Sequence, residues 1–254
     1  MPMLKICAIA SGSNGNCYYI GNEKDAVLID AGISYRQIIT RMNSRNLDPA
    51  KLKAVFISHE HSDHMRGARV LEKKLNIQVW LTSKTYYISY INLLPANPRF
   101  FSPGSIIAVE EFKIHSFLKN HDAAEPCSFR IEYRDKNIGV FTDIGEPCSN
   151  VLSHIKHCDA LFLESNYDEK MLMEGGYPYY LKQRIASSKG HLSNMQALQV
   201  LEKFAGTSLS CVFLSHLSAD NNRPWLAMET MNPLKSKFEI RLTSRTEAAE
   251  LYTL

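Results

Sequence analysis

The chain has 254 residues, of which 45% are hydrophobic and 22% charged, and its formal net charge is +3. This composition is that of a globular protein with a sizeable core, and it excludes a disordered chain. The length suits one α/β domain or two small domains. The small positive charge does not by itself indicate nucleic-acid binding, although it does not oppose a polyanionic substrate.

The sequence gives little indication of a targeting segment or of disulfide bonds. No apolar run reaches the ~18–20 residues that a membrane helix needs, and the first residues follow no signal-peptide pattern. The six cysteines are scattered without a C-x-x-C pair, and several stand in apolar runs. We therefore expect reduced thiols that pack as small hydrophobic groups, in a cytoplasmic protein that does not bind membranes. The sequence does not indicate an oligomeric state.

The first two strand patterns cover residues 6–10 and 17–20, and a loop of serine, glycine and asparagine over residues 11–16 joins them. This loop is either an ordinary hairpin connection or a segment that lines a site. In the second case Asn14 is our candidate for a contact with substrate.

A short buried strand over residues 26–29 ends at Asp30, and a helix is expected over residues 35–42. Asp30 either caps this helix or supports a ligand histidine through a hydrogen bond. The local sequence does not decide between these two roles.

The segment SHEHSDH at residues 58–64 follows an apolar strand over residues 54–57 and carries three imidazoles and two carboxylates. Because alternate side chains of an extended segment share a face, His59 and His61 point the same way while Glu60 points away. Such a cluster at the end of a strand is typical of a metal site. The alternative is a polar loop with incidental histidines.

A second pair of ligands follows within the same segment. If a helix over residues 65–75 begins at Ser62 or Asp63, then Asp63 and His64 turn towards a second point nearby. Two pairs of ligands aimed at neighbouring points are what a hydrolase with two ions about 3.5–4 Å apart requires. The zinc-protease motif H-E-x-x-H does not fit, since Asp63 stands where it needs histidine.

Further strands and helices alternate along the rest of the chain. We expect strands over residues 77–81, 105–109, 112–118, 128–133, 138–141, 160–163 and 238–242, and helices over residues 151–157, 177–187, 195–204 and 221–231, with Ser193 or Asn194 capping the third helix.

Apolar runs in this part of the chain are followed by residues that can bind a metal ion or transfer a proton. His121, Asp143 and His216 each come just after an apolar run, and Glu164 ends another. Each is a weak signal alone, because a lone loop histidine is usually solvated. Sites in open α/β sheets form outside the strand ends, so we expect these residues to converge with the first cluster. His115, His154 and His157 are left out, since their surroundings favour packing or solvation.

A basic stretch leads into His191, which stands at the entrance of a helix. Lys182, Arg184 and Lys189 lie in or just after the helix predicted over residues 177–187. They are either a solvated basic face or contacts for substrate phosphates.

Taken in order, Asp30, the H-x-H-x-D-H motif, His121, Asp143 and His216 resemble the metallo-β-lactamase fold hydrolases over nearly the whole chain. The resemblance implies an α/β fold, the four-layer αββα sandwich, in a single domain over residues 1–254. It also implies two divalent ions, zinc or manganese. The implied ligands are His59, His61 and His121 for one ion and Asp63, His64 and His216 for the other, with Asp143 bridging and Asp30 supporting.

A narrower resemblance, to the YycJ/WalJ group, rests on the loop at residues 11–16, the segment 121–126, Glu164-Ser165-Asn166, residues 190–194 and residues 214–218. This group is related to the tRNA 3′-processing nuclease and is associated with 5′ exonuclease action on double-stranded DNA. The second histidine of the family pattern falls on His191. We expect Asp63, Glu164 and His191 to take part in catalysis, with His191 as the general acid because the implied ligand set is complete without it.

We therefore predict a dinuclear metal-dependent phosphodiesterase, a 5′ exonuclease whose substrate is double-stranded DNA. One alternative is a small-molecule hydrolase, such as a cyclic-phosphate diesterase or thioesterase, on the same site. Others are an RNA-processing nuclease and a scaffold without activity.

Overall fold

The computed structural model describes residues 3–254, which divide into two compact units. Unit 1 contains residues 3–116, 123–127 and 243–254, and unit 2 contains residues 117–122 and 128–242. The single domain expected over residues 1–254 stays a prediction. Within residues 3–254 no helix combines the length and the apolar character that crossing a membrane requires.

Unit 1 is built on a mixed sheet. Its strands within the described residues follow the order β14 (Tyr252–Thr253), β1 (Lys5–Ala10), β2 (Cys17–Gly21), β3 (Ala26–Ile29), β4 (Leu52–Phe56), β5 (Gln78–Leu81) and β6 (Arg99–Phe100). Strands β3 to β6 are parallel to one another, whereas β14, β1, β2 and β3 pair antiparallel. The carboxyl ends of β3, β4 and β5 therefore lie along one edge of the sheet.

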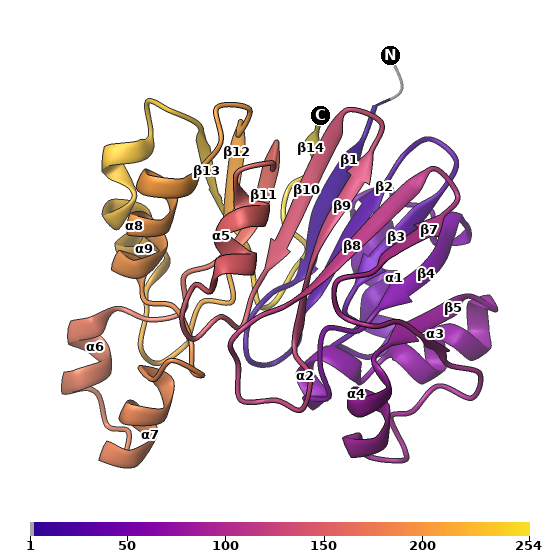
Figure 1. Cartoon of the computed structure of the whole chain (residues 1–254), viewed down its shortest axis with the longest axis horizontal. Coiled ribbons are helices and arrows are strands. Elements are labelled where there is room, and N and C mark those ends of the chain that lie inside the picture. Colours follow the sequence, from indigo (N-terminus) through magenta and orange to yellow (C-terminus); the bar gives the residue numbers. More distant parts are fainter. Residues whose placement is uncertain (1–2) are drawn as a thin grey trace. The chain divides into compact units, whose positions relative to one another are not determined.

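Short helices follow the strands of this unit. They are α1 (Tyr35–Ser44), the 3-10 turn η1 (Pro49–Lys51), α2 (Ser62–Met65), α3 (Ala68–Leu75) and α4 (Ser83–Ile88). Helices α1 and α3 pack beside the sheet (Figure 1). Their side chains Ile38, Met42 and Leu71 belong to its buried core. A hairpin of β7 (Ile106–Val109) and β8 (Phe112–Leu118) belongs to this unit as far as Ser116.

The single helix predicted over residues 65–75 is wrong, because α2 ends at Met65 and α3 starts at Ala68. Gly67 lies at the break, and its backbone N–H donates to the carbonyl of Ala31 at 2.7 Å. A Cβ at this position would lie 2.4 Å from the Ile33 carbonyl oxygen, so only glycine allows the approach.

Unit 2 holds five strands of the second sheet, in the order β13 (Glu239–Leu242), β12 (Cys211–Ser215), β11 (Ala160–Glu164), β10 (Lys136–Phe141) and β9 (Cys127–Tyr133). Strands β10 to β13 are parallel, and β9 pairs antiparallel with β10. Strands β11 and β12 are buried throughout, as expected for strands covered on both faces. Their carboxyl ends share one edge with that of β10.

The helices of unit 2 are α5 (Ser149–Ile155), α6 (Glu169–Glu174), α7 (Tyr179–Ile185), α8 (Asn194–Phe204), α9 (Pro224–Thr230) and the 3-10 turn η2 (Asn232–Leu234). Val151, Leu198 and Ala227, from α5, α8 and α9, pack into its hydrophobic core. Figure 1 shows α8 and α9 side by side. Ser193 caps α8 and forms a reciprocal capping box with Gln196, which confirms the predicted start of this helix.

The predicted strands are confirmed to within two residues at each end, and the sequence reasoning missed α4, α6, β6 and β14. Both helices carry cap signals that were available in the sequence. Thr82 accepts from the backbone N–H of Thr85, and Asp168 accepts from that of Met171. The two strands have only two residues each, too few for a pattern.

Candidate metal centre

The first group of candidate ligands lies at the carboxyl end of β4, in unit 1. His59 Nε2 and His61 Nδ1 are 3.0 Å apart, and their rings meet edge to face. Two imidazoles bound tetrahedrally to zinc at 2.0–2.1 Å have nitrogens about 3.3 Å apart. The spacing of these two side chains is therefore compatible with a shared ion.

The second pair lies on α2, which begins at Ser62. Asp63 Oδ2 is 3.4 Å from His64 Nε2, and His64 is fully buried. The other ring nitrogen of His64 lies 2.7 Å from Asp30 Oδ2. A carboxylate on Nδ1 fixes the proton there and directs Nε2 to a ligand, as is usual for metal-binding histidines.

Asp30 and Ser58 hold these histidines through hydrogen bonds to their ring nitrogens. Asp30 Oδ1 accepts the backbone N–H of Ser58 at 2.8 Å, and Oδ2 accepts the Ser58 hydroxyl at 2.9 Å. The same hydroxyl lies 2.9 Å from His59 Nδ1. Asp30 adopts a left-handed backbone conformation with φ of 61°, and the cap of α1 is Ser34. Capping of α1 by Asp30 is therefore wrong.

Glu60 points away from the two histidines that flank it, as the strand alternation predicts. Its Oε1 accepts the backbone N–H of Ala124 at 2.7 Å. Ser58 is tied to the same segment, because its carbonyl accepts the N–H of Cys127 at 2.9 Å. The segment at residues 123–127 therefore supports the histidine motif.

Asn16 is a site residue that the sequence reasoning missed. Its Nδ2 lies 3.2 Å from His64 Nε2 and 3.4 Å from Asp63 Oδ2. Asn14, the predicted substrate contact, is exposed and donates to the carbonyl of Arg245. The composition of the loop indicated this segment. Asn16 and Asp63 are 47 positions apart, however, so no local sequence pattern predicts their contact.

Gly32 allows this loop to approach α2 closely. Its N–H donates to the Asn16 carbonyl, and the Asn16 N–H donates to the carbonyl of Asp63. A Cβ on Gly32 would lie 1.5 Å from that Asp63 oxygen. Any larger residue would displace Asp63.

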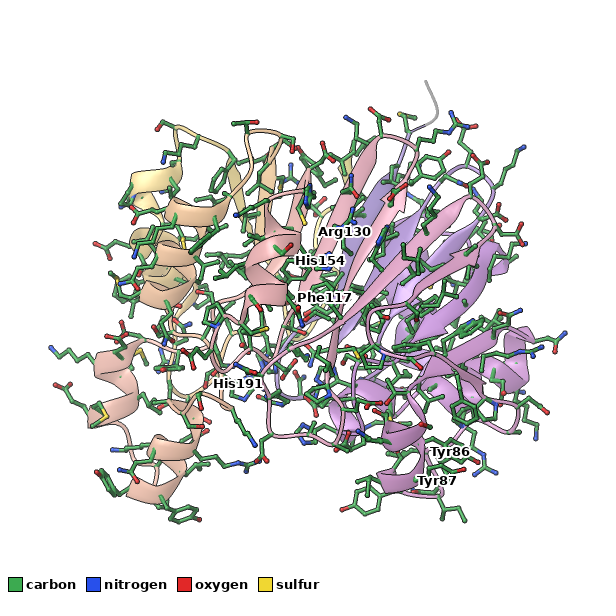
Figure 2. All side chains as sticks on the ribbon, in the orientation of Figure 1. Tyr86, Tyr87, Phe117, Arg130, His154 and His191 are labelled. Carbon is green, nitrogen blue, oxygen red and sulfur yellow. The ribbon has the colours of Figure 1, made fainter. Side chains whose placement is uncertain are left out.

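The second group of candidate ligands lies at the carboxyl ends of parallel strands in unit 2. Asp143 follows β10, Glu164 ends β11 and His216 follows β12. His191, which Figure 2 labels, precedes α8. Asp143, Glu164, His191 and His216 each offer one ligand atom, and these atoms lie within 4.8 Å of one another. Asp143 and His216 have φ of 54° and 56°, left-handed conformations that turn both side chains at the strand ends.

Glu164 is fully buried at the centre of this group. Its Oε1 accepts from Nδ1 of His191 and from Nδ1 of His216, each at 2.8 Å. Burial alone would raise the pKa of Glu164, but the two imidazoles, His191 first, lower it to about 2. Glu164 is therefore a carboxylate that orients both histidines.

His121 enters the same group from the loop after β8. Its Nδ1 lies 3.1 Å from the carbonyl of Gly190, and its Nε2 is 4.0 Å from Asp143 Oδ1. Burial lowers the pKa of His121 to about 3, although the charge of Asp143 opposes this shift. The ring is therefore neutral at pH 7, and a carbonyl at Nδ1 makes Nε2 the nitrogen suited to a metal.

The donor chemistry of both units fits a divalent metal. Each unit supplies imidazole nitrogens and carboxylate oxygens on fixed supports, and this mixture suits zinc, manganese and similar ions. Asp30, Ser58 and Glu164 supply the hydrogen bonds to ring nitrogens that accompany such ligands. The structure therefore supports metal binding.

Of the three basic residues predicted to contact substrate, Lys182 and Arg184 have side chains that bond to other residues of the protein. Lys182 Nζ donates to the carbonyl of Met173 at 2.7 Å. Arg184 forms an ion pair with Asp122 at 2.9 Å, next to His121. Lys189 is exposed, and its carbonyl accepts from the N–H of Asp122. Arg184 thus holds the loop that carries His121, a contact that the sequence pattern did not reveal.

Comparison with known proteins identifies the relatives of this chain. A family model described as a beta-lactamase superfamily domain matches residues 25–217. Exodeoxyribonuclease WalJ of Streptococcus pneumoniae is 33% identical over 232 residues, which cover 89% of this chain and 86% of the relative. Exodeoxyribonuclease YycJ of Bacillus anthracis is 33% identical over 227 residues, which cover 88% of this chain and 86% of the relative.

A solved structure shows the same fold. The metallo-beta-lactamase fold protein YhfI from Bacillus subtilis superimposes with a TM-score of 0.74 at 17% identity, over 100% of both chains. The α/β fold expected from the sequence is thereby confirmed. The predicted resemblance to the YycJ/WalJ group is confirmed by the two exodeoxyribonucleases.

Proposed function

Because the chain belongs to the β-lactamase superfamily, we propose that it is a metal-dependent nuclease that degrades double-stranded DNA from a 5′ end. The observation that carries the proposal is the 33% identity to two exodeoxyribonucleases over nearly nine-tenths of the chain. Phosphodiester hydrolysis also agrees with the imidazole and carboxylate clusters at the strand ends of both units.

We propose that the chain binds two divalent ions, zinc or manganese. His59, His61 and His121 would hold one ion, Asp63, His64 and His216 would hold the other, and Asp143 would serve both. When bound, such ions act as Lewis acids that neutralise phosphate charge and lower the pKa of water. Asp30 and Glu164 keep the rings of His64 and His216 in the orientation that this role requires.

His191 has a separate role in the proposed reaction, that of the general acid. Phosphodiester cleavage expels an alkoxide, which is a poor leaving group unless it is protonated as it departs. Glu164 at 2.8 Å from Nδ1 stabilises a protonated imidazole, so Nε2 can deliver the proton to the leaving oxygen. Asp63 would orient the water nucleophile.

The assay that tests this function uses manganese-loaded and zinc-loaded protein on blunt duplex DNA labelled at the 5′ or the 3′ end. We expect mononucleotide release from the 5′-labelled strand and loss of that release in Asp143→Ala. Asp135→Ala, at an exposed acid of the same unit with 82% of its side chain accessible, is the matched control. Absence of cleavage with either metal would refute the proposal.

Other substrates in the same assay separate the rival activities. Faster cleavage of an RNA duplex of equal sequence would make the protein an RNA-processing nuclease. Turnover of a cyclic nucleotide or a thioester without DNA cleavage would make it a small-molecule hydrolase. The expected cytoplasmic location and absence of membrane binding stay predictions.

A further inference from the structure

The segment that follows β5 exposes aromatic side chains to solvent. Tyr87 is 79% exposed and Tyr90 is 73% exposed, and Phe100 is 48% exposed. The ring of Tyr86 meets those of Tyr87 and Phe100 edge to face, at centroid distances of 5.6 and 5.5 Å. We call Tyr86, Tyr87, Tyr90 and Phe100 the aromatic patch; Figure 2 shows the first two on α4.

The charges of this segment are all positive. Between residues 83 and 100 the charged side chains are Lys84 and Arg99, and the segment contains no aspartate or glutamate. Arg99 is exposed and directly precedes Phe100. Lys84 is paired with Glu125, so Arg99 is the cation that this segment offers beside the exposed rings. Exposed rings next to a cation fit a polyanion that also carries flat apolar groups.

The patch lies at the same edge of the sheet as the histidine motif of unit 1. Strands β4 and β5 are parallel neighbours, so α4 and the motif leave the sheet from the same side. Lys84 Nζ pairs with Glu125 Oε1 at 2.9 Å, and the adjoining residue Ala124 donates to Glu60 within the motif. Ser89 contacts Met65, the residue after His64, at 3.1 Å.

We propose that the aromatic patch binds unpaired bases of a DNA strand by stacking. This inference rests on the proposed nuclease function. It adds that unit 1 binds unpaired bases of the substrate, at the sheet edge that also carries its candidate metal ligands. Ring faces stack only on bases that are not already covered, so a single-stranded tail or a frayed end is the ligand, not the paired region. Tyrosine suits this role, because it presents a large rigid ring at little cost in side-chain entropy.

The test measures binding of fluorescent DNA in EDTA, so that no strand is cleaved. The double variant Tyr87→Ala/Tyr90→Ala should bind a duplex with a single-stranded tail roughly 5- to 150-fold more weakly, the range for loss of one stacked base. Affinity for a blunt duplex and the salt dependence of binding should not change, since no cation is removed. Tyr87→Phe/Tyr90→Phe should bind like the wild type. Trp225→Ala, at another aromatic residue that is 64% exposed, is the control.

Unchanged affinity of the double alanine variant for the tailed duplex would overturn the inference, as would an equal loss in Trp225→Ala. Loss of binding to phosphatidylglycerol vesicles with DNA binding intact would reassign the patch to a membrane surface. Loss of a concentration-dependent dimer in sedimentation, again with DNA binding intact, would reassign it to a second copy of the chain. Tyrosine-dependent binding without DNA cleavage by the metal-loaded wild type would refute the proposed function alone.

Discussion

Glu164→Gln removes one charge from the centre of unit 2 and almost no volume. Glu164 is completely buried, and both its oxygens accept hydrogen bonds. Oε1 accepts from His191 and His216. Oε2 accepts the backbone N–H of Ile144 at 2.7 Å and of Leu192 at 3.1 Å. All these partners are donors, so a carboxylate satisfies them and an amide, with one oxygen only, does not.

The glutamine amide has two possible orientations. If its NH2 group faces the backbone, two buried N–H donors lose their acceptor, at about 1–3 kcal/mol each. If it faces the imidazoles, both rings must move their proton from Nδ1 to Nε2, which costs less. We expect the second arrangement, in which His216 Nε2 carries a proton and no longer binds a metal. Loss of such support lowers metal affinity by about 10- to 100-fold, or about 1.4–2.7 kcal/mol.

Competition with a chromophoric zinc chelator measures this affinity. Urea unfolding of the metal-free protein measures the accompanying change in stability, which should stay below about 2 kcal/mol if the imidazoles take the new proton position. Glu174→Gln, at an exposed glutamate of the same unit, should change neither quantity. Zinc affinity of Glu164→Gln within twofold of the wild type would refute the reasoning.

Three further predictions concern catalysis, substrate binding and the thiols. His191→Ala should keep its metal while kcat on DNA falls about 10²–10⁴-fold. Its kcat on bis(p-nitrophenyl) phosphate should fall far less, because the leaving group of this substrate needs no proton. Equal losses of kcat on the two substrates would contradict the acid role. Replacing Lys182, Arg184 and Lys189 by alanine should flatten the log–log salt dependence of DNA binding by about 0.9 for each phosphate contact; an unchanged slope would make them a solvated face. Cys148 is the one cysteine of residues 3–254 that is not buried, so Cys148→Ser should abolish the fast phase of thiol labelling by Ellman's reagent, and a persisting fast phase would contradict this.

The features that the sequence predicts well are those with a short-range cause. The pairing of His59 with His61 follows from the alternation of an extended segment, and in the structure His59 Nε2 lies 3.0 Å from His61 Nδ1. The placement of Asp143 and His216 at strand ends follows from the apolar runs before them. For these residues a local pattern and the general geometry of parallel sheets are sufficient.

The features that the sequence does not reveal depend on contacts between distant residues. The helix break at Gly67 arises from its hydrogen bond to Ala31, which no helical periodicity reports. Asn16 reaches Asp63 through the close approach that Gly32 allows. The ion pair of Arg184 with Asp122 spans 62 positions, so the basic stretch alone cannot distinguish a structural cation from a phosphate contact.

The number of metal ions bound per chain tests the central claim most directly. Elemental analysis after dialysis against zinc or manganese should give two ions for the wild type, because seven ligands are proposed to serve two positions. Asp143→Ala should lose both ions, since this carboxylate is proposed to be shared, whereas His216→Ala should retain one. Full metal content in Asp143→Ala, or a single ion in the wild type, would contradict the account.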